Sequence, residues 1–458
     1  MSDNKKSEQA ISAPINETID GISRAISERN KPAIEQLLSP LNPGETADVM
    51  DGLPTDDRRQ LIELLPDTLD GEVLLHMGEG AAIELVEEMD ADTLQQATEA
   101  MDTADVVELL DEVLPTDAAK ALLGSMDKQR RERIELNLSF DEHTAGRLMH
   151  TDAITVRENV TVETVQRYLR QYENIPQDTT LLIVVDRENR FKGAVSLLTL
   201  ILHPCETLIS DVMDDDWRTL DPNMSEQEVA RSFENHDWFS APVVDKDGYF
   251  LGRIVVDDVI DTIRDHADHA IMAPVGLDED EDLFAPLLPS AGRRSVWLAL
   301  NLATAFLASW VIGLFEATLE KVVALAVLMP IVASMGGIAG SQTLTLTIRG
   351  LAMGQIADSN RLWLLRKEIG IGLLNGLLWS FVVSIIAYLW FKNQQIAIVL
   401  GAALTLNMLV AALAGIIVPL TLHRMKIDPA LSGAVVLTTV TDVVGFMAFL
   451  GLATIFIL

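Results

Sequence analysis

Five long apolar stretches fill the last third of the chain, and they constrain its fold more than any other feature. They cover residues 295–315, 322–348, 369–391, 396–422 and 430–458. Each reaches the ~20 residues that an α-helix needs to cross the hydrocarbon core of a bilayer. A helix buried in a soluble protein is rarely this long and this free of charge. The sequence therefore predicts an integral membrane protein with a five-helix transmembrane domain over 293–458.

Charged residues are divided unevenly between the two parts of the chain. Of 34 basic and 68 acidic side chains, 10 basic and 6 acidic ones lie from Arg293 onward, which leaves 24 and 62 in the first 292 residues. An acidic surface repels nucleic acid and attracts metal cations. We expect metal ions and not nucleic acid as partners, although a solubilising surface explains most of these carboxylates equally well.

Basic residues in the short loops predict the orientation in the membrane, because Lys and Arg are enriched on the cytoplasmic side. They flank one end of the five stretches: Arg293, Arg294, Arg349, Arg361, Arg366, Lys367, Arg424 and Lys426. The opposite loops hold only Lys321 and Lys392 as basic residues. We expect the front half in the cytoplasm and the C-terminus outside, in a bacterial-type inner (cytoplasmic) membrane. The single Cys205 and the polar residues 1–13, which lack the apolar core of a signal peptide, agree with this.

The second apolar stretch has an unusual composition. Residues 329–343 read Met-Pro-Ile-Val-Ala-Ser-Met-Gly-Gly-Ile-Ala-Gly-Ser-Gln-Thr. Proline, glycines and small hydroxyl residues either break a helix or let another backbone approach closely. Irregular backbone at membrane depth survives only inside protein or beside water, where its carbonyls would face an ion. The alternative is tight packing of small residues between helices.

Three acidic residues within or beside the apolar stretches have distinct expected roles. Asp442 lies near the middle of the fifth, where a carboxylate costs several kcal/mol and needs a partner, by default a cation. Its alternative partners are the neighbouring hydroxyls. Asp428 precedes Pro429 and is either an N-cap or part of an ion path. Glu368, beside Lys367, is expected in a surface ion pair or a helix-dipole contact.

The front half divides into a helical stack and a repeat. We expect a disordered tail over 1–29 and short helices over 30–142, separated at Leu53-Pro54, Leu65-Pro66, Met89-Asp90, Met101-Asp102 and Leu114-Pro115. Residues 146–206 and 207–264 then share one order: short strand, amphipathic helix, apolar strand ending in Asp, Gly-containing strand, helix. This order predicts two similar α/β units paired face to face.

An acidic connection joins the repeat to the membrane over 265–292. Residues Asp257, Asp261, Asp265 and Asp268 recur every three or four positions, which places them on one helix face. Such a stripe repels itself unless cations or bases neutralise it. Either solvent screens the stripe, or divalent ions bind there, and Mg²⁺ suits loose carboxylate clusters because it keeps several of its waters.

This order of parts resembles the MgtE magnesium-transporter family over nearly the whole chain. The most specific matches are 330–352 in the second stretch, Lys-Glu-Ile-Gly-Ile-Gly at 367–372, Asp-Pro-Ala at 428–430, and Thr-Asp-Val-Val-Gly at 441–445. The resemblance implies a multidomain membrane protein. Its parts are an all-α cytoplasmic N domain, a tandem CBS pair of α/β units, a connecting plug helix, and a five-helix domain that forms one pore at a homodimer axis.

The resemblance also implies roles for particular residues. Asp442 would be the pore carboxylate that holds a hydrated Mg²⁺, and the remaining ion path would include Asp428, Gly336, Gly337, Ile338, Gly340 and Gln342. Regulatory Mg²⁺ would bind Asp257, Asp258, Asp261 and Asp265 together with N-domain acids, expected near Asp102, Asp105 and Glu108. Ile338 departs from the family pattern, which has Asn in this Gly-Gly-Asn turn.

The expected function is a Mg²⁺-gated channel that imports Mg²⁺ and closes when cytoplasmic Mg²⁺ is high. Ile338 keeps a second hypothesis open, a carrier for Co²⁺, Mn²⁺ or another cation that is coupled to an ion gradient. A third is a membrane-tethered sensor without transport, because CBS pairs often bind ATP or another adenosine nucleotide. We do not expect an enzyme, since the sequence has no H-E-x-x-H pair, G-x-S-x-G turn or phosphate loop.

Overall fold

The structure is a computed structural model, and it describes residues 15–458 except 66–69, 88, 90, 100, 172–174, 176–178 and 278–280. The chain forms two compact units. The first comprises residues 1–266 and 280–287, and the second comprises residues 267–279 and 288–458. The chain therefore passes between the units three times.

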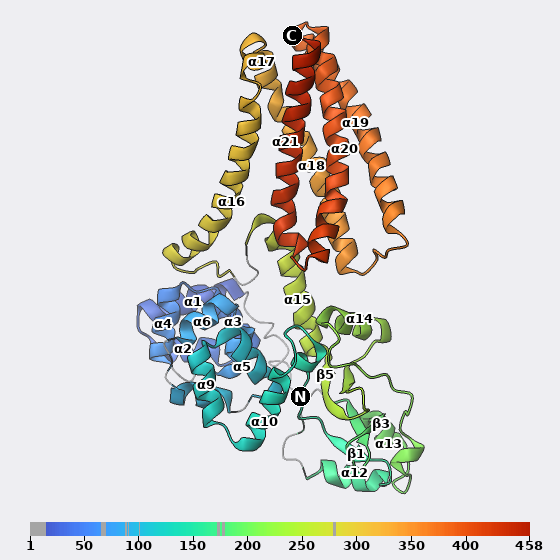
Figure 1. The fold of residues 1–458 in the computed structure, drawn as a ribbon. Coiled ribbons are helices and arrows are strands. Elements are labelled where there is room, and N and C mark those ends of the chain that lie inside the picture. Colours follow the sequence, from blue (N-terminus) through green and yellow to red (C-terminus); the bar gives the residue numbers. More distant parts are fainter. Residues whose placement is uncertain are drawn as a thin grey trace, which may run out of the picture. The chain divides into compact units, whose positions relative to one another are not determined.

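A stack of short helices forms the first part of the first unit (Figure 1). We call this stack the helical domain; its elements are α1 Ile15–Ser27, α2 Lys31–Leu38, α3 Pro43–Asp51, α4 Thr55–Leu64, α5 Gly71–His76, α6 Glu79–Val86, α7 Ala91–Thr98, α8 Thr103–Glu108, the π-helical segment η2 Leu109–Val113, α9 Thr116–Ser125 and α10 Lys128–Leu138. Polar side chains start several helices. Asn42 and Glu45 form a reciprocal capping box on α3, and Asp102 caps α8. The expected breaks at Pro54, Asp102 and Pro115 lie between helices, whereas Pro66 and Asp90 lie outside the described residues.

The expectation of a disordered tail over 1–29 is wrong for its second half. Residues 15–27 form α1, in which Ile22 and Ile26 are fully buried in the core of the helical domain. Apolar residues recur at helical spacing here, so the segment buries one face against α2 and α3 and leaves its acidic face in water. Residues 1–14 lie outside the described residues.

The repeat expected over 146–206 and 207–264 folds as two α/β units. The elements are α11 Ala145–Leu148, β1 Thr155–Arg157, α12 Val162–Leu169, β2 Leu181–Val185, β3 Phe191–Ser196, α13 Leu197–Leu202, the 3₁₀ turn η3 Ile209–Asp211, α14 Glu226–His236, β4 Ser240–Val244, β5 Phe250–Val255 and α15 Val256–Met272. In the first α/β unit, β1 pairs parallel with β2, and β2 pairs antiparallel with β3. In the second, β4 pairs antiparallel with β5, and a single parallel bridge between Leu220 and Val243 replaces the first strand.

The two α/β units pack against each other through matching turns. The carbonyl of Asn189, in the turn after β2, accepts from the Phe250 N–H at 3.0 Å, and the Asn189 side-chain amide donates to the Phe250 carbonyl at 2.9 Å. Phe250 is buried among residues of β2 and β3. The pairing fixes the position of Asp258, because α15 begins one residue after β5.

The acidic connection differs from the expected single segment over 265–292. Helix α15 begins at Val256, so the connecting helix continues the second α/β unit without a break. It ends at Met272, followed by the 3₁₀ turn η4 Ala273–Val275 and by Gly276 at φ +74°. Pro274 cannot continue the α-helix, and Gly276 adopts the left-handed conformation at no steric cost.

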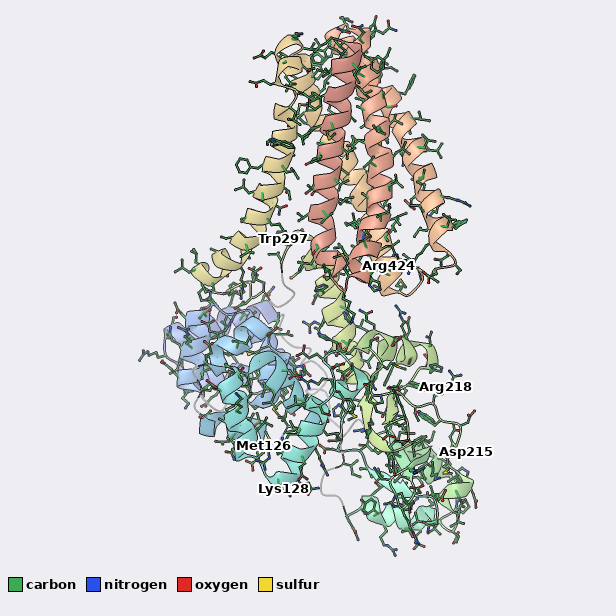
Figure 2. The ribbon with its side chains drawn as sticks, viewed as in Figure 1. Met126, Lys128, Asp215, Arg218, Trp297 and Arg424 are labelled. Atoms are coloured by element: carbon green, nitrogen blue, oxygen red, sulfur yellow. The ribbon has the colours of Figure 1, made fainter. Side chains whose placement is uncertain are left out.

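Five helices in the described residues are long and apolar enough to cross a membrane. They are α16 Leu287–Gly313, α18 Ala324–Ala352, α19 Arg361–Phe391, α20 Gln394–Arg424 and α21 Pro429–Phe456, with the short α17 Glu316–Lys321 after α16. Trp297 in the first half of α16 and Arg424 at the end of α20 lie toward the same end of the bundle (Figure 2), opposite the C-terminus that Figure 1 marks. Helix α20 packs against α18, α19 and α21 and is the most buried of the five.

The expected break in the second apolar stretch does not occur. Helix α18 runs without interruption through Pro330 and through Gly336, Gly337 and Gly340. The small residues serve close packing instead, which was the alternative that the composition left open. A continuous helix satisfies its own backbone hydrogen bonds in an apolar surrounding. Its small residues let the neighbouring helices approach closely.

Candidate functional site

A groove of about 910 Å³ runs along α18 and α21. Small and hydroxyl-bearing side chains supply most of its wall, which consists of Ala333, Ser334, Gly337, Ile338, Ser341, Gln342, Thr345, Leu346, Thr438 and Asp442. The spacing on α18 is helical, so one face of this helix supplies every second-stretch residue of the groove. Asp442 is the acidic group among these lining residues.

Asp442 has no hydrogen-bond partner among the described residues, although it is partly buried. The neighbouring hydroxyls are engaged elsewhere: Thr438 donates to the Ala434 carbonyl at 3.0 Å, and Thr441 donates to the Thr438 carbonyl at 3.0 Å. This geometry excludes the alternative in which the hydroxyls of α21 satisfy the carboxylate. A partly buried carboxylate without a donor attracts a cation.

The expected ion-path residues of α18 divide between two faces of the helix. Gly337, Ile338 and Gln342 line the groove. Gly336 and Gly340 face the opposite way, where an added Cβ would lie 2.2 Å from Asn407 Nδ2 and 2.9 Å from Leu437 Cδ1. These two glycines therefore allow close helix packing, and the structure does not bring them to the groove.

Asn407 of α20 is a buried polar residue that the sequence analysis missed. Its side chain is fully buried, and Nδ2 donates to the Val332 carbonyl at 2.9 Å. An added Cβ at Gly445 would lie 2.7 Å from the same Nδ2, so Asn407 fits between glycines of α18 and α21. The available signal was a lone amide in the middle of an apolar stretch.

Asp428 acts as the N-cap of α21, which was one of its two expected roles. Its carboxylate accepts from the backbone N–H of Ala430 at 2.9 Å and of Leu431 at 3.2 Å. It also lies 2.8 Å from Nε2 of His269, near the end of α15. Asp428 is not among the residues that line the groove.

Glu368 is buried, whereas the sequence predicted a surface ion pair or a helix-dipole contact. Its side chain is 6% exposed, and it accepts a hydrogen bond from Thr343 Oγ1 of α18 at 3.1 Å. Lys367 Nζ lies 3.6 Å from its second oxygen. The neighbouring Lys suggested a solvent-facing pair, but the hydroxyl that determines the burial comes from another helix, which local sequence does not reveal.

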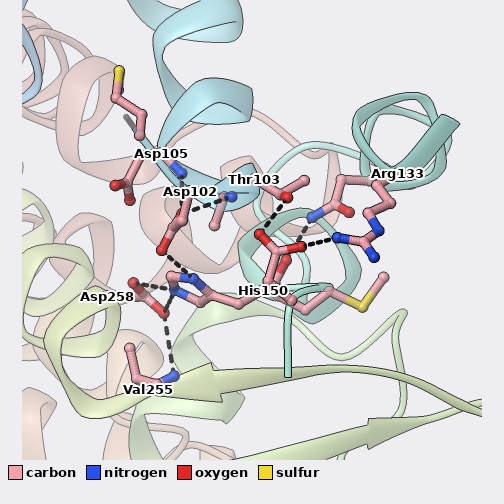
Figure 3. A network of polar contacts seen from close by, with 12 residues as sticks. Asp102, Thr103, Asp105, Arg133, His150, Val255 and Asp258 are labelled. Carbon is pink, nitrogen blue, oxygen red and sulfur yellow. Dashed lines mark hydrogen bonds and ion pairs between the residues drawn. The ribbon is translucent and has the colours of Figure 1, made fainter. Parts of the chain in front are cut away.

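In the first unit, an imidazole ring lies between two carboxylates from different domains. Asp102 Oδ2 of the helical domain lies 2.8 Å from His150 Nδ1, and Asp258 Oδ2 of α15 lies 2.9 Å from His150 Nε2 (Figure 3). Asp105, one turn after Asp102, lies beside them. We call Asp102, Asp105, His150 and Asp258 the His150 cluster. It joins the helical domain to the second α/β unit.

The charges of the His150 cluster control one another. Burial alone would lower the pKa of His150, but Asp258 and Asp102 raise it well above its ordinary value. Burial would raise the pKa of Asp102, but the contact with His150 lowers it. Burial, with Asp102 nearby, raises the pKa of Asp105 to about 7. The buried imidazolium therefore supplies the positive charge that these carboxylates need.

The expected regulatory metal ligands do not assemble into a metal site. Asp102, Asp105 and Asp258 converge, but the His150 ring occupies the space between two of them. Asp257, Asp265 and Glu108 are exposed. Asp257 and Asp261 lie one helical turn apart on the same face of α15, and burial, with Asp257 nearby, raises the pKa of Asp261. Across the described residues, no group of three or more His, Cys, Asp or Glu side chains is placed to hold a metal ion.

Comparison with known proteins then places this arrangement in a family. Family models match the chain over three parts: "MgtE intracellular N domain" at 41–143, "CBS domain" at 145–204 and 209–265, and "Divalent cation transporter" at 329–452. The magnesium transporter MgtE of Thermus thermophilus is 30% identical over 94% of this chain and 97% of its own length. The chain belongs to the MgtE family of magnesium transporters. The expected fold class, with its N domain, CBS pair and five apolar helices, is confirmed.

Other MgtE proteins are similar over shorter lengths. The Bacillus subtilis magnesium transporter MgtE is 28% identical over 79% of this chain and 80% of its own length. Among solved structures, the cytosolic domain of the Mg²⁺ channel MgtE in complex with ATP is 27% identical, with a TM-score of 0.48, over 53% of this chain and 99% of that one.

The CBS pair of this MgtE-family chain contains a second pocket, of about 470 Å³. Its wall includes Trp217, Arg218, His236 and Trp238, and Figure 2 labels Arg218 in this part of the chain. The His236 and Trp238 rings stack with centroids 4.7 Å apart, and Arg218 Nη1 lies 2.7 Å from His236 Nε2. An aromatic wall beside a guanidinium offers a planar surface and a positive charge.

Proposed function

We propose that this chain imports Mg²⁺ across the cytoplasmic membrane along the α18–α21 groove. The observation that carries the proposal is Asp442, a partly buried carboxylate without a partner in the described chain, in a groove lined by hydroxyl and amide groups. Mg²⁺ prefers oxygen ligands and releases its water reluctantly. The carboxylate would attract the hydrated ion, and Thr438, Ser341 and Gln342 would contact its waters.

We propose a homodimer in which two such grooves face each other. A single bundle leaves the groove open on one side, and apolar Ile338 and Leu346 beside Asp442 are 58% and 60% exposed. A carboxylate on a lipid-facing surface is costly. Two-fold symmetry would bring the same groove from both copies together and enclose the ion path.

The orientation in the membrane is inferred from the positions of Lys and Arg, which are enriched on the cytoplasmic side. We propose that the basic end of the bundle, where α16 begins and α20 ends, is cytoplasmic and that the C-terminus is outside. Arg349, Arg361, Arg366 and Arg424 lie at or near the ends of α18, α19 and α20. Cations that enter from outside would meet the groove before they meet the acidic front half, so this half would sample Mg²⁺ after entry.

The acidic front half supports a regulatory role. We propose that high cytoplasmic Mg²⁺ screens the repulsion among exposed carboxylates of α15 and the helical domain and favours a compact, closed arrangement. The close pair Asp257 and Asp261 is the best candidate for such screening. The His150 cluster is not proposed as a Mg²⁺ site, because the His150 imidazolium already neutralises its carboxylates.

A second candidate function belongs to the CBS pocket. We propose that it binds an adenosine nucleotide, since the stacked His236 and Trp238 rings would contact a base and Arg218 a phosphate. Isothermal titration of the full chain with ATP tests this. Binding that weakens at least tenfold in Trp238→Ala supports it, and absence of binding by the unaltered chain contradicts it.

Metal uptake by reconstituted vesicles tests the transport proposal and its main alternative together. We expect Mg²⁺ uptake without a proton gradient. In the groove, Ile338→Asn replaces an apolar side chain by an amide, and we expect it to change the ratio of Mg²⁺ to Co²⁺ or Mn²⁺ uptake. Uptake of Co²⁺ or Mn²⁺ but not Mg²⁺, or uptake only with a proton gradient, would favour the coupled-carrier alternative.

A further inference from the structure

The segment that leads into the first membrane helix is docked on the helical domain. Residues 280–287 group with the first unit, although the residues on both sides of them, 267–279 and 288–458, group with the second. Two of the contacts that hold this segment come from α4. Asp282 pairs with Arg58 of α4, and the Phe284 carbonyl accepts from Thr55 Oγ1 of α4 at 3.4 Å.

Arg58 is nearly inaccessible to solvent, with a side chain that is 1% exposed. Its Nη1 and Nη2 donate to the two oxygens of Asp282 at 2.7 and 3.0 Å, so the contact is bidentate. Its Nε donates to the Met50 carbonyl at 2.8 Å, which fixes the guanidinium on the end of α3. Arginine stays protonated in proteins and matches a carboxylate in this geometry, so the pair forms at every physiological pH.

Asp282 is the counter-charge that makes the burial of Arg58 tolerable. A buried charge whose partner is removed is strongly destabilising. The alternative acid, Asp51, accepts from the Gly78 N–H at 2.9 Å through Oδ2, and its buried Oδ1 has no hydrogen-bond partner in the described chain. Arg58 Nη2 donates to the backbone carbonyl of Asp51 and not to its carboxylate. The carboxylate that pairs with the Arg58 guanidinium is therefore that of Asp282.

The docked turn is also ordered from within. Asp282 Oδ1 accepts from the Phe284 N–H at 2.8 Å, which closes a local turn next to the Arg58 contact. Leu283, between the two contact residues, is 83% exposed. The segment is thus held at two positions on one side and faces water on the other.

Asp282 lies only five positions before Leu287, the first residue of α16. Even fully extended, five residues span at most ~18 Å. We propose that the helical domain carries a docking site for segment 281–287, built on Arg58 and Thr55, and that its occupation restrains the first membrane helix during transport. The helical domain then acts on the membrane domain through two connections, α15 and this segment. This inference rests on the proposed transport function.

Hydrogen exchange of the full chain in lipid nanodiscs, read by mass spectrometry, tests the docking. Asp282→Asn removes the charge that pairs with Arg58, and we expect exchange of the 281–287 amides to accelerate at least tenfold. Leu283→Ala is the matched control in the same segment and is expected to exchange as the unaltered chain does. Equal exchange in Asp282→Asn and the unaltered chain would overturn the docking site.

A second measurement separates the docking from its consequence. In reconstituted vesicles, we expect Asp282→Asn to change the Mg²⁺ flux, or the internal Mg²⁺ concentration that halves it, at least threefold, with Leu283→Ala unchanged. If the segment is released but flux and its Mg²⁺ response stay the same, the proposed restraint on α16 is wrong. Failure of the proposed function is distinguishable, because the unaltered chain would then carry no Mg²⁺.

One further variant guards against misfolding. The double variant Arg58→Met with Asp282→Leu replaces the buried ion pair by apolar side chains, which proteins often tolerate. We expect it to keep the slow exchange of segment 281–287 and to restore the flux. Fast exchange of segment 281–287 in the double variant, with the rest of the helical domain still protected, would show that apolar side chains do not hold the segment. It would contradict the expectation that any contact which keeps the segment docked restores the flux.

Discussion

At the scale of single residues, two neighbouring glycines of α18 have opposite environments. Gly336 faces Asn407, whereas a Cβ at Gly337 would meet no atom within 4 Å. A side chain at position 336 would therefore collide with Asn407, whereas a side chain at position 337 would meet no other part of this chain. The difference separates the packing role of the motif from its role in the groove.

We expect Gly336→Ala to destabilise the membrane domain by ~1–3 kcal/mol, because the added methyl group overpacks a filled contact. It would also displace the Asn407 amide from the Val332 carbonyl. Thermal unfolding in detergent measures the change. Gly337→Ala is the matched control and should unfold as the unaltered chain does. Equal destabilisation by both variants would mean that Asn407 does not fill the space beside Gly336.

The His150 cluster predicts a pH dependence for the joint between the helical domain and the CBS pair. The raised pKa of His150 means that its stabilising contribution is complete below the ordinary histidine pKa and is lost as pH rises through the higher folded value. Asp105, with a pKa of about 7, changes in the same direction, because its ionisation in the joint is unfavourable. Asp102, whose pKa is lowered, stabilises the joint above the ordinary Asp pKa, and this contribution is lost as pH falls below that value.

We therefore expect the joint to be most protected at about pH 4, just above the ordinary Asp pKa, and to loosen as pH rises, through Asp105 up to about pH 7 and through His150 above the ordinary histidine pKa. Exchange of the amides of α8 and of residues 253–258, measured across this pH range and corrected for intrinsic exchange, reports it. His150→Lys keeps a cation at the position and should remove most of the pH dependence above 7. A joint that tightens as pH rises from 7 to 9 would contradict the assignment of charge in this cluster.

At the scale of elements, sequence patterns predicted the membrane helices and the repeat well. Long apolar runs, apolar strands that end in Asp and amphipathic helices are local signals, so the five spans, β2 to β5 and α14 lie where the patterns indicated. The errors arose where distant contacts decide. Glu368 is buried because Thr343 approaches it from α18, and α18 stays continuous because α20 and α21 pack against its glycines.

The candidate site was predictable in type but not in arrangement. An acid in an apolar span indicated Asp442, and its lack of a partner agrees with that role. No sequence pattern showed that Gly336 and Gly340 face away from the groove, because the direction depends on which helices pack against α18. The same holds for the His150 cluster: its acids were anticipated, whereas the histidine that neutralises them stands 45 or more positions away from each of them in the chain.

Helix α1 provides a test at the element scale. Ile22 is fully buried in the core of the helical domain, whereas Ile15 is 39% exposed. We expect Ile22→Ala to lower the stability of the helical domain by ~2–5 kcal/mol, the usual cost of a large-to-small change in a core. Ile15→Ala should cost much less. Urea unfolding followed by circular dichroism distinguishes them, and equal midpoints would show that α1 is not part of the core.

At the scale of the whole molecule, the chain combines a groove whose one acid has no partner in the described residues with an acidic front half that buries its own imidazolium. The first arrangement suits an ion in transit, because Asp442 has no other partner among the described residues. The second suits regulation, because charge pairs connect the helical domain to the second α/β unit and to segment 281–287. Both depend on the charge division that is visible in the sequence.

The central claim is that Asp442 attracts the transported Mg²⁺. Asp442→Asn keeps the size of the side chain and removes its charge, so we expect Mg²⁺ flux into reconstituted vesicles to fall at least about tenfold, the effect of ~1.4 kcal/mol of lost attraction. Asp358→Asn, an exposed acid in the loop between α18 and α19, is the matched control and should transport normally. Undiminished Mg²⁺ flux through Asp442→Asn would contradict the account.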